Sequence, residues 1–144
     1  MNSLLKRTIV VLLLVSMAFC AAGCKSTDVL DEKVVAMIDC NVAHEPESGY
    51  DLLYPGVQDR EEYIAAFDKI DEYFPVTAGY TWVRQKTTVT KGSDSYEIIE
   101  GQYKIEFDGQ VFHIYAAWRS DLKGSGFVVF RIFNEDDWST VNKG

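Results

Sequence analysis

The sequence predicts an α+β domain in which N-terminal helices pack on a curved, four-stranded antiparallel sheet. Two observations predict this class. Up to Pro75 the apolar residues recur every three or four positions, which is helical spacing, whereas after Pro75 they recur at every second position, which is strand spacing. The later stretches are also separated by short polar turns, as in an antiparallel meander. Helices in such a chain must cover the apolar face of the sheet.

The first helix is predicted over residues 29–44. Its apolar residues fall on one face, with charged residues between them, as in an amphipathic helix. They are Leu30, Val34, Met37, Ile38 and Val42. Pro46 and Gly49 are expected to interrupt the chain after this helix. Residues 50–56 should then form one or two turns at most.

A second helix is predicted to begin after Asp59 and to end at Pro75. Asp59 can cap the helix, and Glu62, three residues later, completes a capping-box pattern. Proline ends the helix because it cannot continue the backbone hydrogen bonds. The predicted apolar face consists of Ile64, Phe67, Ile70 and Phe74, with Tyr63 alongside and Asp71 as its one polar member.

The first two strands are predicted at residues 79–90 and 96–107, joined by a polar turn. The first of them is rich in β-branched and aromatic residues, which favour strands. In the second, the apolar residues change parity at Gly101: Tyr96 and Ile98 precede it, and Tyr103, Ile105 and Phe107 follow it. A bulge at Gly101 would add one residue and bring both sets to the same face.

The dipeptide Asp108-Gly109 predicts a two-residue hairpin turn into a third strand. Such a turn fixes the register of the two strands that it joins. On the apolar inner face the expected pairs are Phe107 with Gln110, Ile105 with Phe112, and Tyr103 with Ile114, and Ala116 and Trp118 continue this face. On the outer face the expected pairs are Glu106 with Val111, Lys104 with His113, and Gln102 with Tyr115.

A fourth strand is predicted at residues 127–133, where Arg131 marks the outer face. Val128, Phe130 and Ile132 should then point inward. The outer face would carry an apolar band formed by Val111, Tyr115, Phe127, Val129 and Phe133. Soluble monomers rarely expose such a band, so we expect a homodimer or a protein partner on it. The alternative is that a C-terminal segment containing Trp138 folds over this face.

The first residues predict export. A short segment with Lys6 and Arg7 precedes an uncharged apolar stretch that is too short to span a bilayer, as in a secretion signal. The stretch ends in Ala21-Ala22-Gly23-Cys24, which resembles the lipobox of bacterial lipoproteins, with Ala21 where leucine is common. We expect Cys24 to carry a diacylglyceryl lipid that tethers the chain to the outer face of a bacterial cell membrane.

The predicted organisation is a signal peptide at 1–23, a lipid-anchored tether at 24–28, one domain at 29–137 and a tail at 138–144. Cleavage would leave Cys40 as the one cysteine not lipidated, so no internal disulfide is expected. The net charge of −8 argues against a nucleic-acid partner and against a flat contact with anionic lipid.

The order of elements, the helix end at Phe74-Pro75, and the long strands through "GQYKIEFDGQVFHIYAAW" and "GFVVFRIF" resemble the NTF2-like (cystatin-like) α+β cone. A plain two-layer α+β sandwich is the competing architecture. The resemblance implies a pocket lined by Phe67, Ile70, Tyr103, Ile105, Phe112, Ile114, Trp118 and Phe130. The same residues could instead simply fill a core. We expect a non-enzymatic lipoprotein that binds a small apolar ligand or a protein partner.

The alternative function is an isomerase- or dehydratase-type enzyme of this fold, with Asp71 as the acid in the pocket. Burial would raise the pKa of Asp71, as a general base requires. His113 should point outward, away from the pocket, and His44 should lie near a helix end. Cys40 and His44 have the spacing of two metal ligands on a helix, but no second ligand pair accompanies them. We therefore expect no metal, no cofactor and no catalytic residue.

Overall fold

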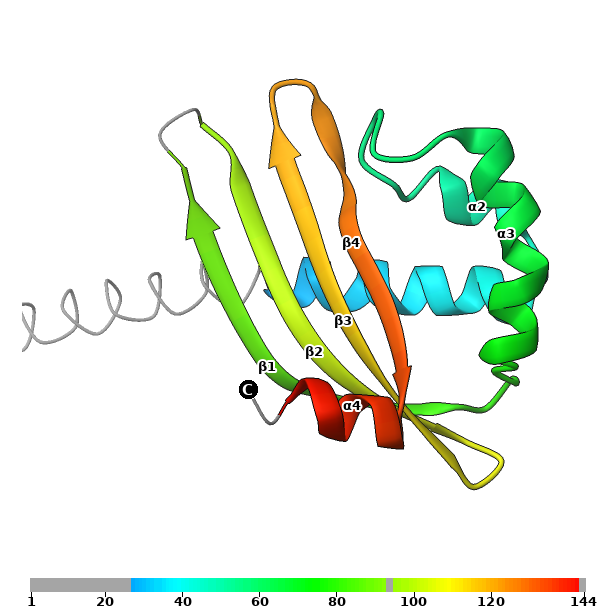
Figure 1. Ribbon diagram of the computed structural model, residues 1–144. Helices are drawn as coiled ribbons and strands as arrows, with labels where there is room; N and C mark the ends of the chain where they lie inside the picture. Colours follow the sequence, from blue (N-terminus) through cyan, green and yellow to red (C-terminus); the bar gives the residue numbers. More distant parts are fainter. Residues whose placement is uncertain (1–26, 93–94, 143–144) are drawn as a thin grey trace, which may run out of the picture.

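The computed structural model describes residues 27–92 and 95–142, and it has the predicted order of helices followed by an antiparallel sheet (Figure 1). The N-terminal helix (residues 27–42) is followed by α2 (Pro46–Tyr50), α3 (Arg60–Tyr73), β1 (Thr81–Lys91), β2 (Glu97–Phe107), β3 (Gln110–Asp121), β4 (Gly124–Asn134) and α4 (Glu135–Val141). The predicted signal peptide and Cys24 lie outside the described residues. No helix in the described ranges has the length and apolar content needed to cross a membrane.

The strands form one antiparallel meander in the order β1-β2-β3-β4. The register predicted from Asp108-Gly109 is confirmed, with Ile105 opposite Phe112 and Lys104 opposite His113. Asp108 and Gly109 have φ angles of 48° and 71°. Both lie in the left-handed region that the tight hairpin turn requires and that glycine adopts without strain.

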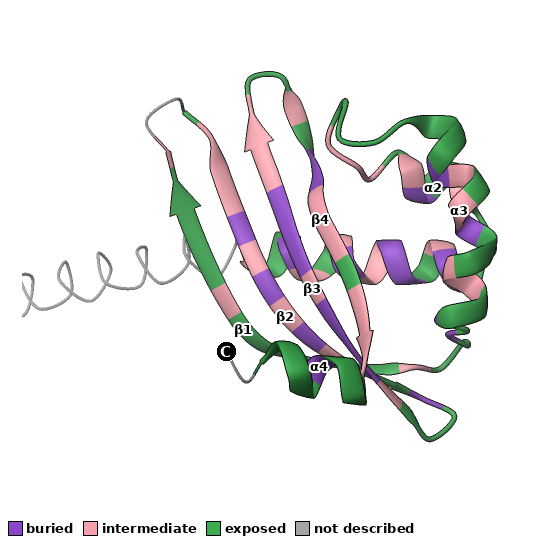
Figure 2. Ribbon diagram, viewed as in Figure 1, coloured by how far each residue is buried: buried purple, intermediate pink, exposed green. Residues whose placement is uncertain are grey.

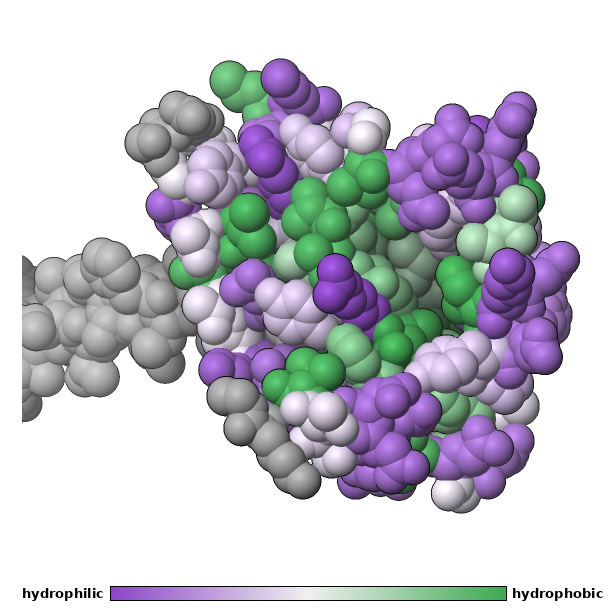
Figure 3. Space-filling view, in the orientation of Figure 1, coloured by the Kyte–Doolittle hydropathy of each residue, from purple (hydrophilic) through white to green (hydrophobic). Residues whose placement is uncertain are grey.

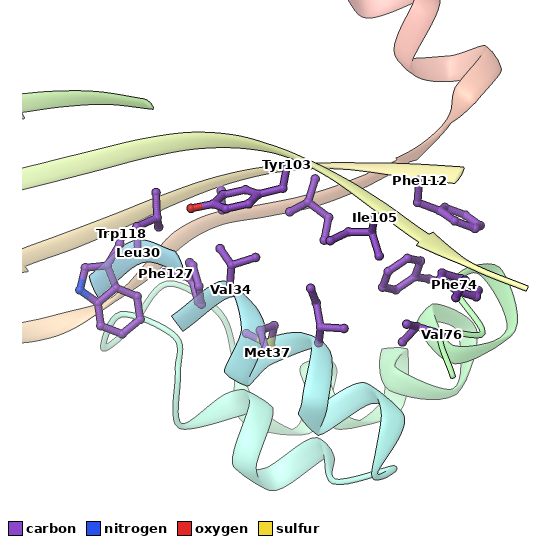
Figure 4. Close-up of a cluster of buried hydrophobic side chains, with 14 of the residues drawn as sticks. Leu30, Val34, Met37, Phe74, Val76, Tyr103, Ile105, Phe112, Trp118 and Phe127 are labelled. Carbon is purple, nitrogen blue, oxygen red and sulfur yellow. The ribbon is translucent and has the colours of Figure 1, made fainter. Parts of the chain in front are cut away.

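The core lies between the N-terminal helix and the inner face of the sheet (Figures 2 and 4). Leu30, Val34 and Ile38 of the helix are buried, as predicted from their spacing. The Tyr103 hydroxyl donates to Asp31 Oδ1 at 2.7 Å, across the helix–sheet contact. Burial and this bond raise the pKa of Tyr103 above its usual range. The helix is therefore fixed to the sheet by both apolar packing and a specific polar contact.

The predicted bulge at Gly101 is wrong. Gly101 pairs with Ala116 of β3 and with Thr87 of β1, and the buried residues of β2 alternate regularly from Ile99 onward. Ile99, rather than Ile98, therefore belongs to the inner face. Gly101 instead permits a close approach, because a Cβ there would lie 2.7 Å from Leu30 Cδ2.

The real irregularities lie in the outer strands. One lies in β1, between Arg84 and Lys86. The other lies in β4: Ala117 pairs with Val129 and Trp118 pairs with Phe127, so Val128 is one additional residue. Because of this extra residue, Phe127 points inward and is buried against Trp118, with ring centroids 4.9 Å apart. The predicted outward position of Phe127 is wrong, whereas Phe130 and Ile132 face inward as predicted.

Two short helices were not expected. Pro46 begins α2 instead of only interrupting the chain, since proline is accepted in the first helical turn. α4 crosses the predicted tail boundary at residue 138. The side chain of Asn134 caps it by accepting a hydrogen bond from the backbone N–H of Asp137 at 2.8 Å. Buried Trp138 packs α4 against the outer face of the sheet, on the side opposite the N-terminal helix (Figure 1).

Candidate functional site

A groove of about 560 Å³ lies between β4, α3 and the N-terminal helix, and Figure 3 shows this hollow with hydrophobic side chains on its walls. Its volume is in the range of small-ligand sites. The N-terminal helix contributes Met37, Ile38 and Asn41, and α3 contributes its face from Tyr63 to Tyr73, which Phe74 follows. The remaining walls come from the loop before α3 and from residues 127–132 of β4.

The groove exists because α3 is held at its two ends. At its start, Asp59 caps the helix by accepting hydrogen bonds from the backbone N–H groups of Glu61 and Glu62 at 2.9 and 3.1 Å, which confirms the predicted cap. Tyr63 in the first turns packs on Tyr50 of α2, with ring centroids 5.7 Å apart. Just after the last turn, Phe74 packs on Phe112 at 4.9 Å. Phe67 and Ile70, between these anchors, line the groove.

A second wall comes from an extended segment at residues 52–54, which pairs with the edge of β4. Phe127 donates its N–H to the Leu52 carbonyl at 2.8 Å, and Tyr54 donates its N–H to the Phe127 carbonyl at 3.0 Å. Gly126 allows this approach, because a Cβ there would overlap the backbone of Leu53 and Tyr54. The Tyr54 hydroxyl adds a hydrogen bond to Asp121 Oδ2 at 2.7 Å.

The polar groups at the groove are few. The side-chain oxygen of Asn41 is buried and has no hydrogen-bond partner in the described part of the chain. Nearby, Tyr63 is buried and donates its hydroxyl to Met37 Sδ at 3.6 Å, and burial raises its pKa to about 12. The described lining residues include Lys69 and Arg131 but no Asp or Glu. In a chain with a net charge of −8, this absence of acidic residues sets the groove apart from the rest of the surface.

Three of the eight predicted pocket residues line the groove: Phe67, Ile70 and Phe130. The other five are buried and belong to the core: Tyr103, Ile105, Phe112, Ile114 and Trp118. Asn41 and the segment at 52–54 were missed. One signal for Asn41 was available: it follows Met37 by four residues and Ile38 by three, which places a polar side chain on the apolar face of the helix.

The predicted outer apolar band is partly covered. Val111, Tyr115, Val129 and Phe133 lie on the outer face as expected, but each is half-buried. Phe133 packs on Trp138 with ring centroids 5.5 Å apart. His113 points outward, as predicted, yet it is only 4% exposed because Trp138 stacks on it at 5.0 Å. The stated alternative, in which a C-terminal segment folds over this face, therefore holds for the end that Trp138 covers.

The residues considered for catalysis and for metal binding do not line the groove. Asp71 lies in the last turn of α3, where its Oδ2 is 3.2 Å from His44 Nδ1. Cys40 is a free thiol whose pKa is raised, chiefly by partial burial and also by the charges of Glu45 and Asp39. Among the described residues, no three His, Cys, Asp or Glu side chains are grouped as a metal site would need.

The sequence matches no protein-family profile and no curated protein. Among solved structures, the chain is similar to an NTF2-like protein from Cytophaga hutchinsonii, with 12% sequence identity and a TM-score of 0.47, over 75% of this chain and 97% of that one. The helices and the curved four-stranded antiparallel sheet described above are consistent with the NTF2-like α+β cone that was predicted for this sequence.

Proposed function

We propose that this domain is a non-enzymatic binding module that holds a largely apolar ligand in the groove between β4 and α3. The observation that carries the proposal is an apolar groove of about 560 Å³ lined in part by Asn41, whose buried side-chain oxygen has no hydrogen-bond partner among the described residues. A buried polar atom without a partner is costly, and a ligand that donates a hydrogen bond removes this cost. Apolar walls with a few polar groups are typical of ligand sites.

The alternative of an enzyme that uses Asp71 has less support. A general base must lie within hydrogen-bond reach of the substrate atom that it deprotonates. Asp71 does not line the groove, and its carboxylate is beside His44 at 3.2 Å. The side chain of Asp71 is also 32% exposed, so it is not enclosed in an apolar site as the enzyme alternative expected.

Neighbouring alanines of α3 offer a matched test of ligand binding. Ala66 lines the groove, whereas Ala65 is exposed and does not. Ala66→Trp should fill the groove and abolish binding of the fluorescent apolar anion anilinonaphthalene sulfonate, while Ala65→Trp should leave binding unchanged. Fluorescence titration of the purified proteins measures the difference. Equal binding by the two variants, or no binding by the unaltered protein, would contradict the proposal.

We further propose that the module is held at the outer face of a bacterial membrane by a lipid on Cys24. Support comes from the sequence, in which Ala21-Ala22-Gly23-Cys24 follows a short apolar stretch. In Cys24→Ala the protein should lose its added fatty-acid mass in mass spectrometry. Cys20→Ala is the matched control and should keep that mass. Retention of the lipid by Cys24→Ala would refute the anchor.

A further inference from the structure

β4 is an edge strand, and part of its edge faces the groove. Residues 127–132 all line the groove. Side chains alternate between the two faces of a sheet, and Arg131 pairs with Tyr115 on the outer face. Consecutive residues from both faces can border one hollow only if the hollow lies along the edge of the strand. The groove therefore meets the backbone of β4 as well as its inward side chains.

The two ends of this edge show which backbone groups point toward the groove. At one end, Phe127 uses its N–H and carbonyl to pair with the segment at 52–54. At the other end, Asn134 donates its N–H to the Tyr73 hydroxyl at 3.3 Å. In an antiparallel strand the direction of the backbone groups alternates. Ile132 and Phe130 lie two and four residues before Asn134, so their backbone groups point to the same side as those of Asn134. The additional residue Val128 shifts the alternation by one position, and the backbone groups of Phe127 therefore point to that side as well.

The backbone groups of Phe130 and Ile132 are therefore free between two occupied ends. In the described ranges, no backbone hydrogen bond outside the sheet is made by either residue. A purely apolar small molecule in the groove would remove these groups from water without offering them a partner, which is unfavourable. An extended peptide would offer its own N–H and carbonyl groups.

From this geometry we infer that the natural ligand is an extended peptide that adds to β4 as a fifth strand. The inference rests on the proposed function and names the class of ligand. The chain itself shows the mode of binding, since Leu53 already forms a parallel bridge with Phe127 on the same edge. Alternate apolar side chains of the peptide would face Phe67 and Ile70 on α3.

The length and charge of the peptide follow from the same residues. At roughly 3.3 Å per residue, positions 128–133 span about 17 Å, which is enough for about five extended residues. Lys69 lies on the α3 side of the groove, and the described lining has no acidic residue. Peptides with an acidic residue beside the apolar segment should therefore bind better than peptides with a basic one.

The test compares two pools of seven-residue, end-blocked peptides with Val, Ile, Leu or Phe at alternate positions. In the second pool alternate backbone amides are N-methylated, so those peptides cannot pair with a strand edge. The full chain in lipid nanodiscs is immobilised, and retained peptides are counted by mass spectrometry. We expect about tenfold greater retention of the first pool, loss of this retention in Ala66→Trp, and full retention in Ala65→Trp. A tenfold ratio is a readily measured difference in affinity.

Two failures can be told apart. If anilinonaphthalene sulfonate binds in an Ala66→Trp-sensitive way but both pools are retained equally or not at all, the groove binds small apolar molecules and the peptide inference is overturned. If the dye does not bind either, the proposed function itself fails. A second measurement is amide hydrogen exchange. The bound pool should slow exchange at Phe130 and Ile132 about tenfold, and unchanged exchange there would also overturn the inference.

Discussion

Gly126 decides whether the segment at 52–54 can lie against β4, and Gly126→Ala tests this directly. A Cβ at this position would overlap backbone atoms of Leu53 and Tyr54. Backbone atoms cannot rotate away as the end of a long side chain can, so the segment must move. The substitution should therefore detach the segment from the edge of β4.

The expected loss can be worked out from the contacts. Detachment removes the two hydrogen bonds between Phe127 and the segment, at 2.8 and 3.0 Å, each worth about 0.5–1.5 kcal/mol. It also disturbs the hydrogen bond from Tyr54 to Asp121. The free energy of unfolding should fall by about 2–4 kcal/mol. Without a collision the same change would raise stability by about 0.4–1 kcal/mol, because alanine restricts the unfolded chain. A fall in the free energy of unfolding would therefore indicate the collision, and a rise would indicate that there is none.

Urea denaturation monitored by circular dichroism measures this effect. With a slope of about 1.5 kcal/mol per molar urea, the midpoint should fall by about 1.3–2.7 M. Ser125→Ala is the matched control, because Ser125 is exposed and adjacent, and should change stability by less than about 0.5 kcal/mol. An unaltered or raised midpoint for Gly126→Ala would refute the account of the segment.

Three further changes test other contacts. Tyr103→Phe should lower the free energy of unfolding by about 1.5–3 kcal/mol in urea titrations, because it removes the 2.7 Å hydrogen bond to the Asp31 carboxylate. Trp138→Ala should lower it by about 3 kcal/mol and release α4 from the sheet, which a rise in protease cleavage within α4 would report. In Asp121, the hydrogen bond from Tyr54 is the main cause that lowers the carboxyl pKa to about 2. Because this folded-state pKa is below the usual 3.8, the carboxylate stabilises the fold above about pH 4 and loses that effect as the pH falls toward 2. Asp121→Asn should therefore show a smaller loss of stability between pH 4 and pH 2 than the unaltered protein.

Each of these changes has a control or a contrary result. Tyr80→Phe removes a similar hydrogen bond, to Asp39 at 2.9 Å, but at an exposed site, so it should cost less than Tyr103→Phe. Val141→Ala in α4 should be nearly neutral because Val141 is 58% exposed. If Asp121→Asn followed the same pH dependence as the unaltered protein, the stabilising role of the carboxylate would be wrong.

Local signals predicted most of the fold. Helical spacing located the buried face of the N-terminal helix, and the cap at Asp59 located the start of α3. Asp108-Gly109 fixed the register of β2 and β3 because the geometry of a two-residue turn leaves little choice. In each case the signal and the structure that it specifies lie within a few residues of each other in the chain.

The errors arose where two arrangements fit the same residues. The stretch "FVVF" is apolar throughout, so alternation cannot show where an additional residue lies, and Phe127 was assigned to the wrong face. A glycine within a strand fits either a bulge or a close approach, and at Gly101 the close approach of Leu30 was the cause. The helix α4 is too short to show periodicity.

The groove could be predicted only in part because it depends on where α3 stands relative to β4. The sequence identified Phe67 and Ile70 as apolar helix residues and Phe130 as an inward strand residue. Whether they meet in a core or face each other across a hollow depends on the anchors at the two ends of α3. Those anchors, such as Phe74 on Phe112, join residues far apart in the sequence.

The N-terminal helix is synthesised before the strands on which it packs. Asp31 lies 72 residues before its partner Tyr103, and Lys33 lies over the ring of Trp118, which is still further along the chain. During synthesis the apolar stripe of this helix has nothing to pack on until the meander has formed. Contacts of such long sequence separation require closure of large loops and slow the formation of the native state. The chain should therefore remain without a native core until most of it has been made, and its folding rate should depend on the late strands.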